Sequence, residues 1–167
     1  ERNYYPLPRI GTGPSNMARV GSYQYFWATW VEALNTTKTT QPSFRIAYNT
    51  ISAGTVYLHA TISDLTIHPG VDGMDNIACG RADVPFDPDA KDTIPQSKGG
   101  SQPSDCWTVY THSSASEDNE TVWLDGTATW HVQVEAPNGT PLAQLGDFHY
   151  VVTQRQAVGE VEPLTDW

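Results

Sequence analysis

Apolar and polar residues alternate along most of the chain from residue 44 onward. A two-residue period of this kind is typical of a β-strand that buries one face and exposes the other to water. It runs through five stretches, at residues 44–48, 56–62, 107–111, 128–134 and 148–152. The pattern predicts an all-β protein.

Two interruptions of the alternation predict a bulge and a turn. The apolar phase shifts between Ile62 and Leu65, which predicts a turn or bulge near Ser63 and Asp64. Residues 137–141 (Pro-Asn-Gly-Thr-Pro) predict a hairpin turn, because Asn-Gly accepts the positive φ angles that such turns need. With turns between some seven short strands, the favoured architecture is a two-sheet antiparallel β-sandwich.

Three other segments depart from the alternation. Residues 1–22 are dense in proline and glycine, which excludes a helix and predicts an extended arm. Residues 23–34 hold two Tyr, one Phe and two Trp; their spacing also fits a helix, but this composition favours a strand. Residues 83–105 are first acidic and then small and polar, which predicts a long surface loop.

Length and charge restrict the class of protein. A chain of 167 residues with 38% apolar residues fits one compact domain. A formal net charge of −10 disfavours nucleic-acid phosphates and anionic lipid headgroups as partners. No stretch approaches the roughly 20 apolar residues of a membrane span, so we expect no membrane insertion. Because the chain opens at Glu1 without a signal-like apolar segment, we expect a processed chain or a piece of a longer one.

The two cysteines, Cys79 and Cys106, allow one intramolecular pairing and lack the Cys-x-x-Cys spacing of redox and zinc sites. We favour a structural disulfide, which in the chain-entropy account stabilises the fold by about 3–4 kcal/mol. Two buried free thiols are the alternative. A disulfide persists outside the reducing cytosol, and a chain rich in Thr and poor in Lys suits exposed strand faces. These features indicate a secreted β-protein.

Several motifs resemble those of PKD domains. Residues 65–73 (Leu-Thr-Ile-His-Pro-Gly-Val-Asp-Gly) are similar to the family's strand that ends in Trp and runs into a Gly-Asp-Gly turn, although the tryptophan is absent here. Residues 106–115, 128–134 and 152–158 resemble the closing strands of PKD-like modules in secreted or envelope proteins of actinobacteria. The likeness covers residues 44–158.

This resemblance implies an immunoglobulin-like (PKD-like) β-sandwich, whose usual role is that of a spacer, adhesion or protein-contact module without catalytic residues. It divides the chain into an extended arm and aromatic edge segment at residues 1–42, the sandwich at 43–158 and a C-terminal tail at 159–167. It also implies a location outside the cell, secreted or in the cell envelope. It transfers no active site.

The sequence offers few candidates for catalysis or metal binding. The acidic residues at 83–92 are candidate ligands for Ca²⁺, but two prolines intervene and the glycine of a calcium loop is missing, so we favour a solvated acidic loop. His131 and His149 are expected to face each other across the last hairpin as a surface pair. Finding no nucleophile elbow or phosphate-binding glycine loop, we expect no enzyme activity, metal or cofactor. A carboxylate pair for glycoside hydrolysis leaves no local signature and stays open.

Aromatic residues are the remaining candidates for a functional surface. Trp107 and Trp130 fall on the inner phases of their strands and are assigned to the core. Other aromatic residues exceed what one sandwich needs to bury, and they suit a protein interface. The residues expected to bind a partner are Tyr4, Tyr5, Tyr25, Trp27 and Trp30. The alternative is that the segment at 23–30 covers the sandwich edge of its own chain.

The sequence therefore predicts a non-enzymatic extracellular structural or adhesion subunit that makes protein–protein contacts in a cell-envelope or surface assembly. Its partners would be other protein subunits of that assembly. A carbohydrate-binding module, which holds polysaccharide on exposed aromatic side chains, is the alternative function.

Overall fold

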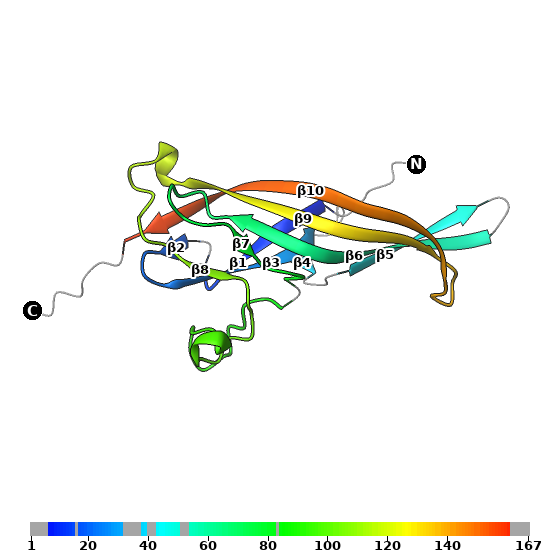
Figure 1. Cartoon of the computed structure of the whole chain (residues 1–167), viewed down its shortest axis with the longest axis horizontal. Helices are drawn as coiled ribbons and strands as arrows, with labels where there is room; N and C mark the ends of the chain where they lie inside the picture. Colours follow the sequence, from blue (N-terminus) through cyan, green and yellow to red (C-terminus); the bar gives the residue numbers. More distant parts are fainter. Residues whose placement is uncertain are drawn as a thin grey trace, which may run out of the picture.

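A computed structural model of the chain describes residues 7–15, 17–31, 38–39, 43–50, 54–82 and 84–160. Long strands run along an elongated body, and one loop projects from its side (Figure 1). The only helices among these residues are two 3₁₀ turns, η1 (Gln96–Lys98) and η2 (Asp118–Glu120), which are far too short to cross a lipid bilayer.

The strands form two sheets. The four-stranded sheet has β3 (Tyr23–Val31) in its middle, flanked by β1 (Leu7–Gly13) on one side and by β4 (Lys38–Thr39) and β8 (Trp107–Val109) on the other. The six-stranded sheet contains β2 (Met17–Arg19), β5 (Ser43–Thr50), β6 (Gly54–His68), β7 (Ile77–Ala78), β9 (Val122–Glu135) and β10 (Pro141–Gly159). Its order is β2–β10–β9–β6–β5, and β7 pairs with β6 beyond the end of β5.

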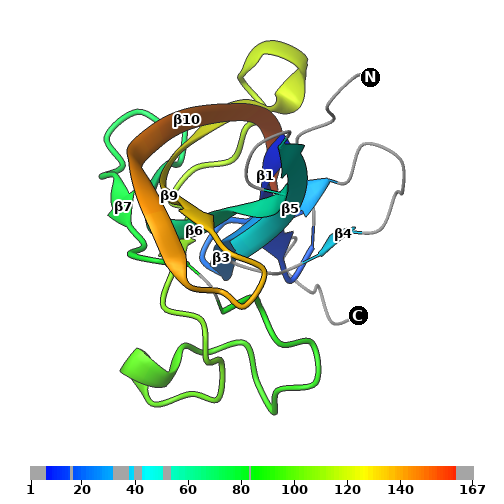
Figure 2. The ribbon, with the colours of Figure 1, turned by 90° about the vertical axis from the view of Figure 1, so that its right-hand side faces the viewer.

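The prediction of an all-β chain with two sheets is confirmed, but the pairing is not antiparallel throughout, because β2 pairs with β10 in parallel. The six-stranded sheet is not flat, because the natural twist between neighbouring strands accumulates along its long members. Seen along the long axis of the molecule, β6, β9 and β10 curl around an interior like half a barrel (Figure 2). The four-stranded sheet packs against the concave face of this curl.

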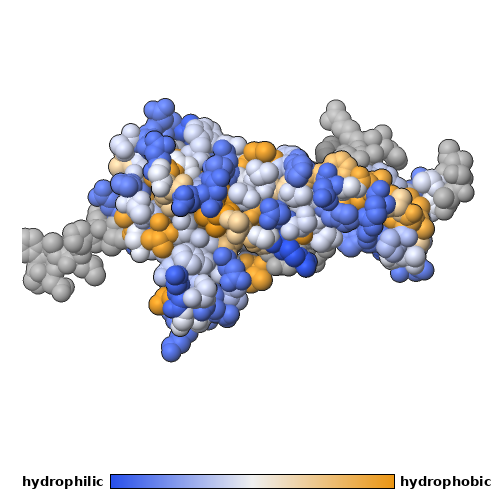
Figure 3. Space-filling model, viewed as in Figure 1, coloured by the Kyte–Doolittle hydropathy of each residue, from blue (hydrophilic) through white to orange (hydrophobic). Residues whose placement is uncertain are grey.

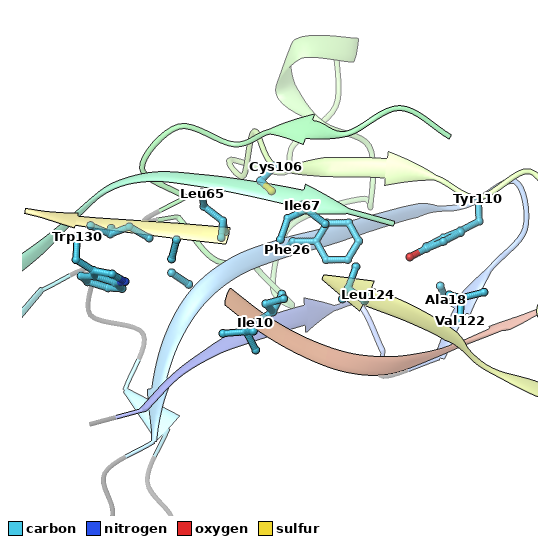
Figure 4. Close-up of a cluster of buried hydrophobic side chains, with 14 of the residues drawn as sticks. Ile10, Ala18, Phe26, Leu65, Ile67, Cys106, Tyr110, Val122, Leu124 and Trp130 are labelled. Atoms are coloured by element: carbon cyan, nitrogen blue, oxygen red, sulfur yellow. The ribbon is translucent and has the colours of Figure 1, made fainter. Parts of the chain in front are cut away.

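The hydrophobic core lies between the two sheets. Every second residue of β9 from Val122 to Val132 is buried, in agreement with the alternation in the sequence. These side chains share a cluster with Ile67 of β6 and with Ile10 and Phe26 of the other sheet (Figure 4). The two sheets therefore share one core.

This core crosses the predicted boundary between an arm at residues 1–42 and a sandwich at 43–158. Ile10 on β1, Ala18 on β2 and Phe26 on β3 are at most 7% exposed and belong to the buried cluster. The described part of the predicted arm is therefore an integral part of the domain. The aromatic segment forms a strand, as expected, but this strand is the centre of a sheet.

The glycine and proline residues that predicted an arm are compatible with an edge strand. β1 pairs on one side only among the residues described, and an edge strand tolerates Pro8 at its second position. Gly11 lies against the indole of Trp27, since a Cβ added to this glycine would stand 2.2 Å from Trp27 Cε2. Glycine here permits close approach between two strands.

Both predicted interruptions of the alternation are present. The pairing of β6 with β9 shifts between Ile62 and Asp64, after which Leu65 is buried again. In the β9–β10 hairpin, Gly139 has a φ of 86° and its N–H donates to the Ala136 carbonyl. The first of these features is a β-bulge, which restores the apolar residues of β6 to the core.

The long loop between β7 and β8 begins and ends at the disulfide Cys79–Cys106, which the structure contains as the sequence predicts. In Figure 1 it is the green segment that hangs below the body. Its organising side chain is Gln102, which is 1% exposed. The Gln102 amide donates to the carbonyls of Asp87 and Asp92 and accepts from the Asp87 N–H.

Replacing Ile10 with Ala is expected to lower the free energy of unfolding by about 2–5 kcal/mol, because the change leaves a cavity in the shared core. Urea denaturation measures this effect. The control Val84→Ala, at a residue that is 41% exposed, should change the stability by less than about 0.5 kcal/mol. Equal effects of the two changes would mean that β1 lies outside the core.

Replacing both Cys79 and Cys106 with Ala is expected to lower the free energy of unfolding by about 3–4 kcal/mol, since the unfolded chain regains the freedom of a loop that spans 27 positions. Denaturation without reductant compares the variant with the wild type. Wild-type protein unfolded with reductant should match the variant. Two alkylatable thiols in protein that was never reduced would contradict the bond.

Candidate functional site

Exposed apolar side chains gather on the first half of β10. Five of the nine large apolar side chains that are exposed among the described residues lie there. These five form the β10 apolar row: Leu142 (58%), Leu145 (50%), Phe148 (53%), Tyr150 (42%) and Val151 (60%). Figure 3 shows apolar surface, in orange, over the end of the body where β9 and β10 approach their hairpin. Clustering of this kind marks an interaction surface.

This half of β10 has a described strand on one side only. β9 pairs with β10 along almost its whole length, whereas β2 pairs only with residues 157–159. Along residues 141–156, no described strand pairs with the backbone groups of β10 that point away from β9, although β1 comes close to β10. Such an edge is a template for pairing with a further strand.

Two members of the row, Phe148 and Tyr150, continue the inner face of the sheet. Phe148 stands opposite Trp130, and Tyr150 stands opposite Ala128. Residues directly opposite in an antiparallel pair share a face, yet Trp130 and Ala128 are 4% and 3% exposed while Phe148 and Tyr150 are about half exposed. Among the described residues, no strand pairs with β10 beyond Phe148 and Tyr150, so the apolar face extends from the core to the sheet edge.

The other face of these strands carries a polar network centred on Glu135, which is 5% exposed. One carboxylate oxygen accepts hydrogen bonds from His59 Nδ1 and Gln133 Nε2, both at 2.6 Å, and the other accepts from Arg45 Nε at 3.0 Å. The His59 hydrogen bond is the main cause that lowers the pKa of the Glu135 carboxyl below its usual value. The network joins β5, β6 and β9.

Arg45 extends this network to the β9–β10 hairpin. Its guanidinium donates to the carbonyls of Ala136 and Pro137, at 2.9 and 3.4 Å. The same group lies 3.8 Å from the centroid of the Tyr57 ring, within the range of a cation–π contact. Arg45 therefore fastens β5 to the hairpin and covers one aromatic face of the outer surface.

His131 connects β9 to β10 on the same outer surface. Its Nδ1 lies 2.9 Å from Asp147 and its Nε2 lies 2.6 Å from Gln144. The hydrogen bond to Asp147, followed by that to Gln144, raises the pKa of His131 because both acceptors favour the protonated ring. The predicted pairing of His131 with His149 is wrong, since the bulged register places Asp147 opposite His131 and Thr129 opposite His149.

A hydroxyl, an imidazole and a carboxylate are aligned within this network. Thr61 Oγ1 lies 3.5 Å from His59 Nε2, and His59 Nδ1 lies 2.6 Å from Glu135. Nucleophilic catalysis also needs donors aimed at a developing oxyanion. These side chains stand on strands whose backbone groups engage in pairing with their neighbours. The arrangement is therefore better suited to holding neighbouring strands together than to catalysing acyl transfer.

The structure removes Tyr25 from the predicted partner-binding residues. Its side chain is fully buried, its hydroxyl donates to the Thr93 carbonyl at 2.8 Å, and its ring packs against Phe86. Both contacts come from the loop between β7 and β8, which folds over β3. Contacts with so distant a segment leave no signal in the local sequence around Tyr25.

The other predicted anchors have different outcomes. Trp27 is half-buried against Gly11 of its own sheet. Tyr4, Tyr5 and the side chain of Trp30 lie outside the described residues. Their role in binding a partner stays a prediction.

Of the two tryptophans assigned to the core, only Trp130 is fully buried. Trp107 is half-buried and makes an edge contact with the ring of Tyr23, with their centroids 5.2 Å apart. Trp107 lies on β8, at the margin of the four-stranded sheet. A strand in that position covers its side chains less completely than β9 does.

Carboxylates of the acidic loop organise the loop itself. Asp87 Oδ1 accepts from the Asp89 N–H, and Asp92 Oδ1 accepts from the N–H groups of Ser101 and Ile94. The bonds from Ser101 and Ile94 lower the pKa of Asp92. Within the described ranges, no group of three or more His, Cys, Asp or Glu residues is arranged to hold a metal ion. The calcium interpretation therefore gains no support.

The β10 apolar row is not among the predicted site residues, although the sequence carries a signal for it. Val151 interrupts the alternation by placing an apolar residue on the polar phase, and Leu142 and Leu145 precede it in a strand that contains only two charged residues, Asp147 and Arg155. Alternation alone assigns Phe148 and Tyr150 to a buried face. It does not show that no described strand pairs with β10 beside these two residues.

Replacing Glu135 with Gln is expected to reduce the acid sensitivity of the fold. Because folding lowers the pKa of this carboxyl, its ionised form stabilises the fold above the usual value of 4.5, and this contribution is lost as the pH falls through the lower folded value. Urea midpoints measured from about pH 6 to about pH 3 should fall less steeply in the variant. The control Asp118→Asn, at an exposed carboxylate, should keep the wild-type slope, and an unchanged slope in Glu135→Gln would refute the role of the network.

Comparison of the chain with protein-family models, with curated proteins and with solved structures finds no match. The resemblance to PKD-like modules therefore rests on the residues quoted above. Function has to be inferred from the surface that the fold presents.

Proposed function

We propose that this chain is a non-enzymatic extracellular module that holds proteins together in a cell-envelope or surface assembly. The observation that carries the proposal is the β10 apolar row, which lies on residues 141–156, where no described strand pairs with the side of β10 that faces away from β9. A strand laid along this edge gains main-chain hydrogen bonds, and its side chains gain apolar contacts with Phe148 and Tyr150. An extended protein segment is the ligand that uses both features.

The strand order supports an immunoglobulin-like, PKD-like architecture for the module. β3 lies between β1 and β8, as strand B lies between A and E in immunoglobulin domains, and β6, β9 and β10 are neighbours in the order of strands C, F and G. The disulfide departs from that pattern, because it closes the loop between β7 and β8 instead of joining strands B and F.

The disulfide supports the extracellular part of the proposal. A bond between Cys79 and Cys106 persists in oxidising compartments and is rare in cytosolic proteins. The loop that it closes is ordered by the buried side chain of Gln102. A structural role for the bond fits a protein that works outside the cell.

Carbohydrate binding is the second candidate, and the polar outer face favours it. The outer face offers an amide, an imidazole and a carboxylate that can form hydrogen bonds with sugar hydroxyls, on Gln133, His131 and Asp147. Sugar rings also need an open aromatic face, however, and guanidinium groups lie over Tyr57 and Trp123, with Arg155 4.6 Å from the Trp123 ring. The outer face is therefore a weaker candidate for binding a sugar than the β10 edge is for binding a protein strand.

Photo-crosslinking tests the proposed function. A benzophenone amino acid placed at Phe148, in the cells that make the protein, should form a covalent adduct whose other component is identified as protein by mass spectrometry. The control is the same amino acid at Val84, which is exposed and lies in the loop between β7 and β8, and it should give no such adduct. Adducts with glycan at Phe148, or the same protein adducts at both positions, would contradict the proposal.

A glycan array discriminates between the two candidates. A protein-contact module should show no saccharide preference above the level of a Tyr57→Ala variant, whose outer face has lost the Tyr57 ring. Selective binding of one saccharide class that is lost in Tyr57→Ala would instead establish the outer face as the functional site.

A further inference from the structure

We propose that the strand which pairs with the β10 edge is β10 of a second copy of this chain, antiparallel and related by a two-fold axis at Phe148. The inference rests on the proposed function, because it uses the same edge. It adds the identity of the partner and the register of the pairing.

The sequence of the exposed edge is complementary to itself when reversed. Residues 145–151 read Leu-Gly-Asp-Phe-His-Tyr-Val. With Phe148 opposite itself, Asp147 meets His149, Gly146 meets Tyr150, and Leu145 meets Val151. Each of these three pairs then occurs twice, as an isologous interface requires. Acid–base, glycine–aromatic and apolar pairs are all favourable across two antiparallel strands.

The faces of these residues agree with the register. Phe148 and Tyr150 share the inner face with Trp130 and Ala128, whereas Asp147 and His149 stand opposite His131 and Thr129 on the outer face. In the paired state, the two inner faces would form one continuous apolar surface centred on two Phe148 rings. The acid–base pairs would lie outside it, where water reaches them.

Both members of the acid–base pair have an atom available for it. Asp147 Oδ1 receives the His131 hydrogen bond, which leaves Oδ2 for the contact with a partner. His149 Nδ1 lies 3.1 Å from the Thr129 hydroxyl, which leaves Nε2 for the contact. The internal bonds hold both side chains in place before a second copy arrives.

Local charge permits the approach of a second copy. The chain carries a net charge of −10, but β10 contains one acidic and one basic residue, Asp147 and Arg155. Natural edge strands usually avoid self-pairing through lysine, proline or inward-pointing charge. Between residues 142 and 159 there is no lysine or proline, and the inner-facing Phe148 and Tyr150 are apolar.

The neighbouring structure limits the pairing to this stretch. At one end, the register of β10 shifts between Gln144 and Gly146 and again nearer the hairpin. At the other end, Val152 is buried, and β2 occupies the edge from Ala157 onward. Between these limits, residues 147–151 pair regularly with β9 and are exposed, while Leu145 and Gly146 lie at the bulge beside them.

Sedimentation analysis of the purified chain tests whether the second copy binds. We expect a monomer–dimer equilibrium in the micromolar range, since a short strand pairing belongs to the small, transient class of interfaces. Phe148→Lys should shift the protein to monomer and leave its melting temperature unchanged. The control Val84→Lys, at a side chain of similar exposure outside β10, should dimerise as the wild type does.

Cysteine cross-linking tests the register. Residues directly opposite in antiparallel strands have Cα atoms about 4.5–5.5 Å apart, within the range of a disulfide. Phe148→Cys should therefore form a covalent dimer on mild oxidation. Val151→Cys should not, because its two copies would stand six positions apart along the strands, about 20 Å.

A charge exchange separates the contact between copies from effects within one copy. His149→Asp should weaken the dimer by about tenfold or more, since it places two carboxylates opposite each other. Adding Asp147→Arg to that variant should restore dimerisation, although this second change removes the internal bond between Asp147 and His131. Failure of the double variant to recover would overturn the proposed register.

A chain that stays monomeric at several hundred micromolar overturns the second-copy proposal, as does cross-linking through Val151→Cys in place of Phe148→Cys. Either result leaves the proposed function standing if photo-crosslinking at Phe148 identifies a different protein. An adduct at Phe148 that contains only a second copy of this chain would instead keep the self-pairing and remove the role in an assembly with other proteins. A dimer in solution that gives no protein adduct at Phe148 would overturn the proposed register.

Discussion

β9 pairs along almost its whole length with β6 on one side and β10 on the other, and most features of the molecule depend on this double pairing. Its inner residues, from Val122 to Val132, supply the centre of the core against which β1 and β3 pack. Its outer residues include Glu135 and His131, which bind side chains of the neighbouring strands. One strand therefore organises both faces of the curled sheet.

The difference in length between β10 and its other neighbour creates the candidate site. β10 has 19 residues, whereas β2 has 3 and covers only the end of β10. Apolar side chains that would be buried beside a longer strand, such as Phe148 and Tyr150, are left about half exposed. The polar network on the other face fixes β10 to β9 through His131 and Asp147, so the exposed edge is held in a defined shape before anything binds.

The local pattern of the chain was sufficient to predict features that depend on neighbouring residues. Alternation identified the long strands, the phase shift near Ser63 identified the bulge, and Asn138 followed by Gly139 identified the hairpin. The pairing of Cys79 with Cys106 followed because only two cysteines exist. Each of these inferences rests on the period of a strand, the φ preference of a turn or a count, all of which are properties of the sequence itself.

Tertiary structure alone decided which strand lies beside which. The burial of Tyr25 depends on a loop that returns to it from residue 93, and the inclusion of β1 in the core depends on its pairing with β3. The opposition of His131 and Asp147 depends on register shifts in β10. Alternation shows which side chains share a face, but whether that face is covered depends on the neighbouring strand. For Phe148 no described strand lies beyond β10, and this is why a pattern typical of a buried strand forms an exposed surface.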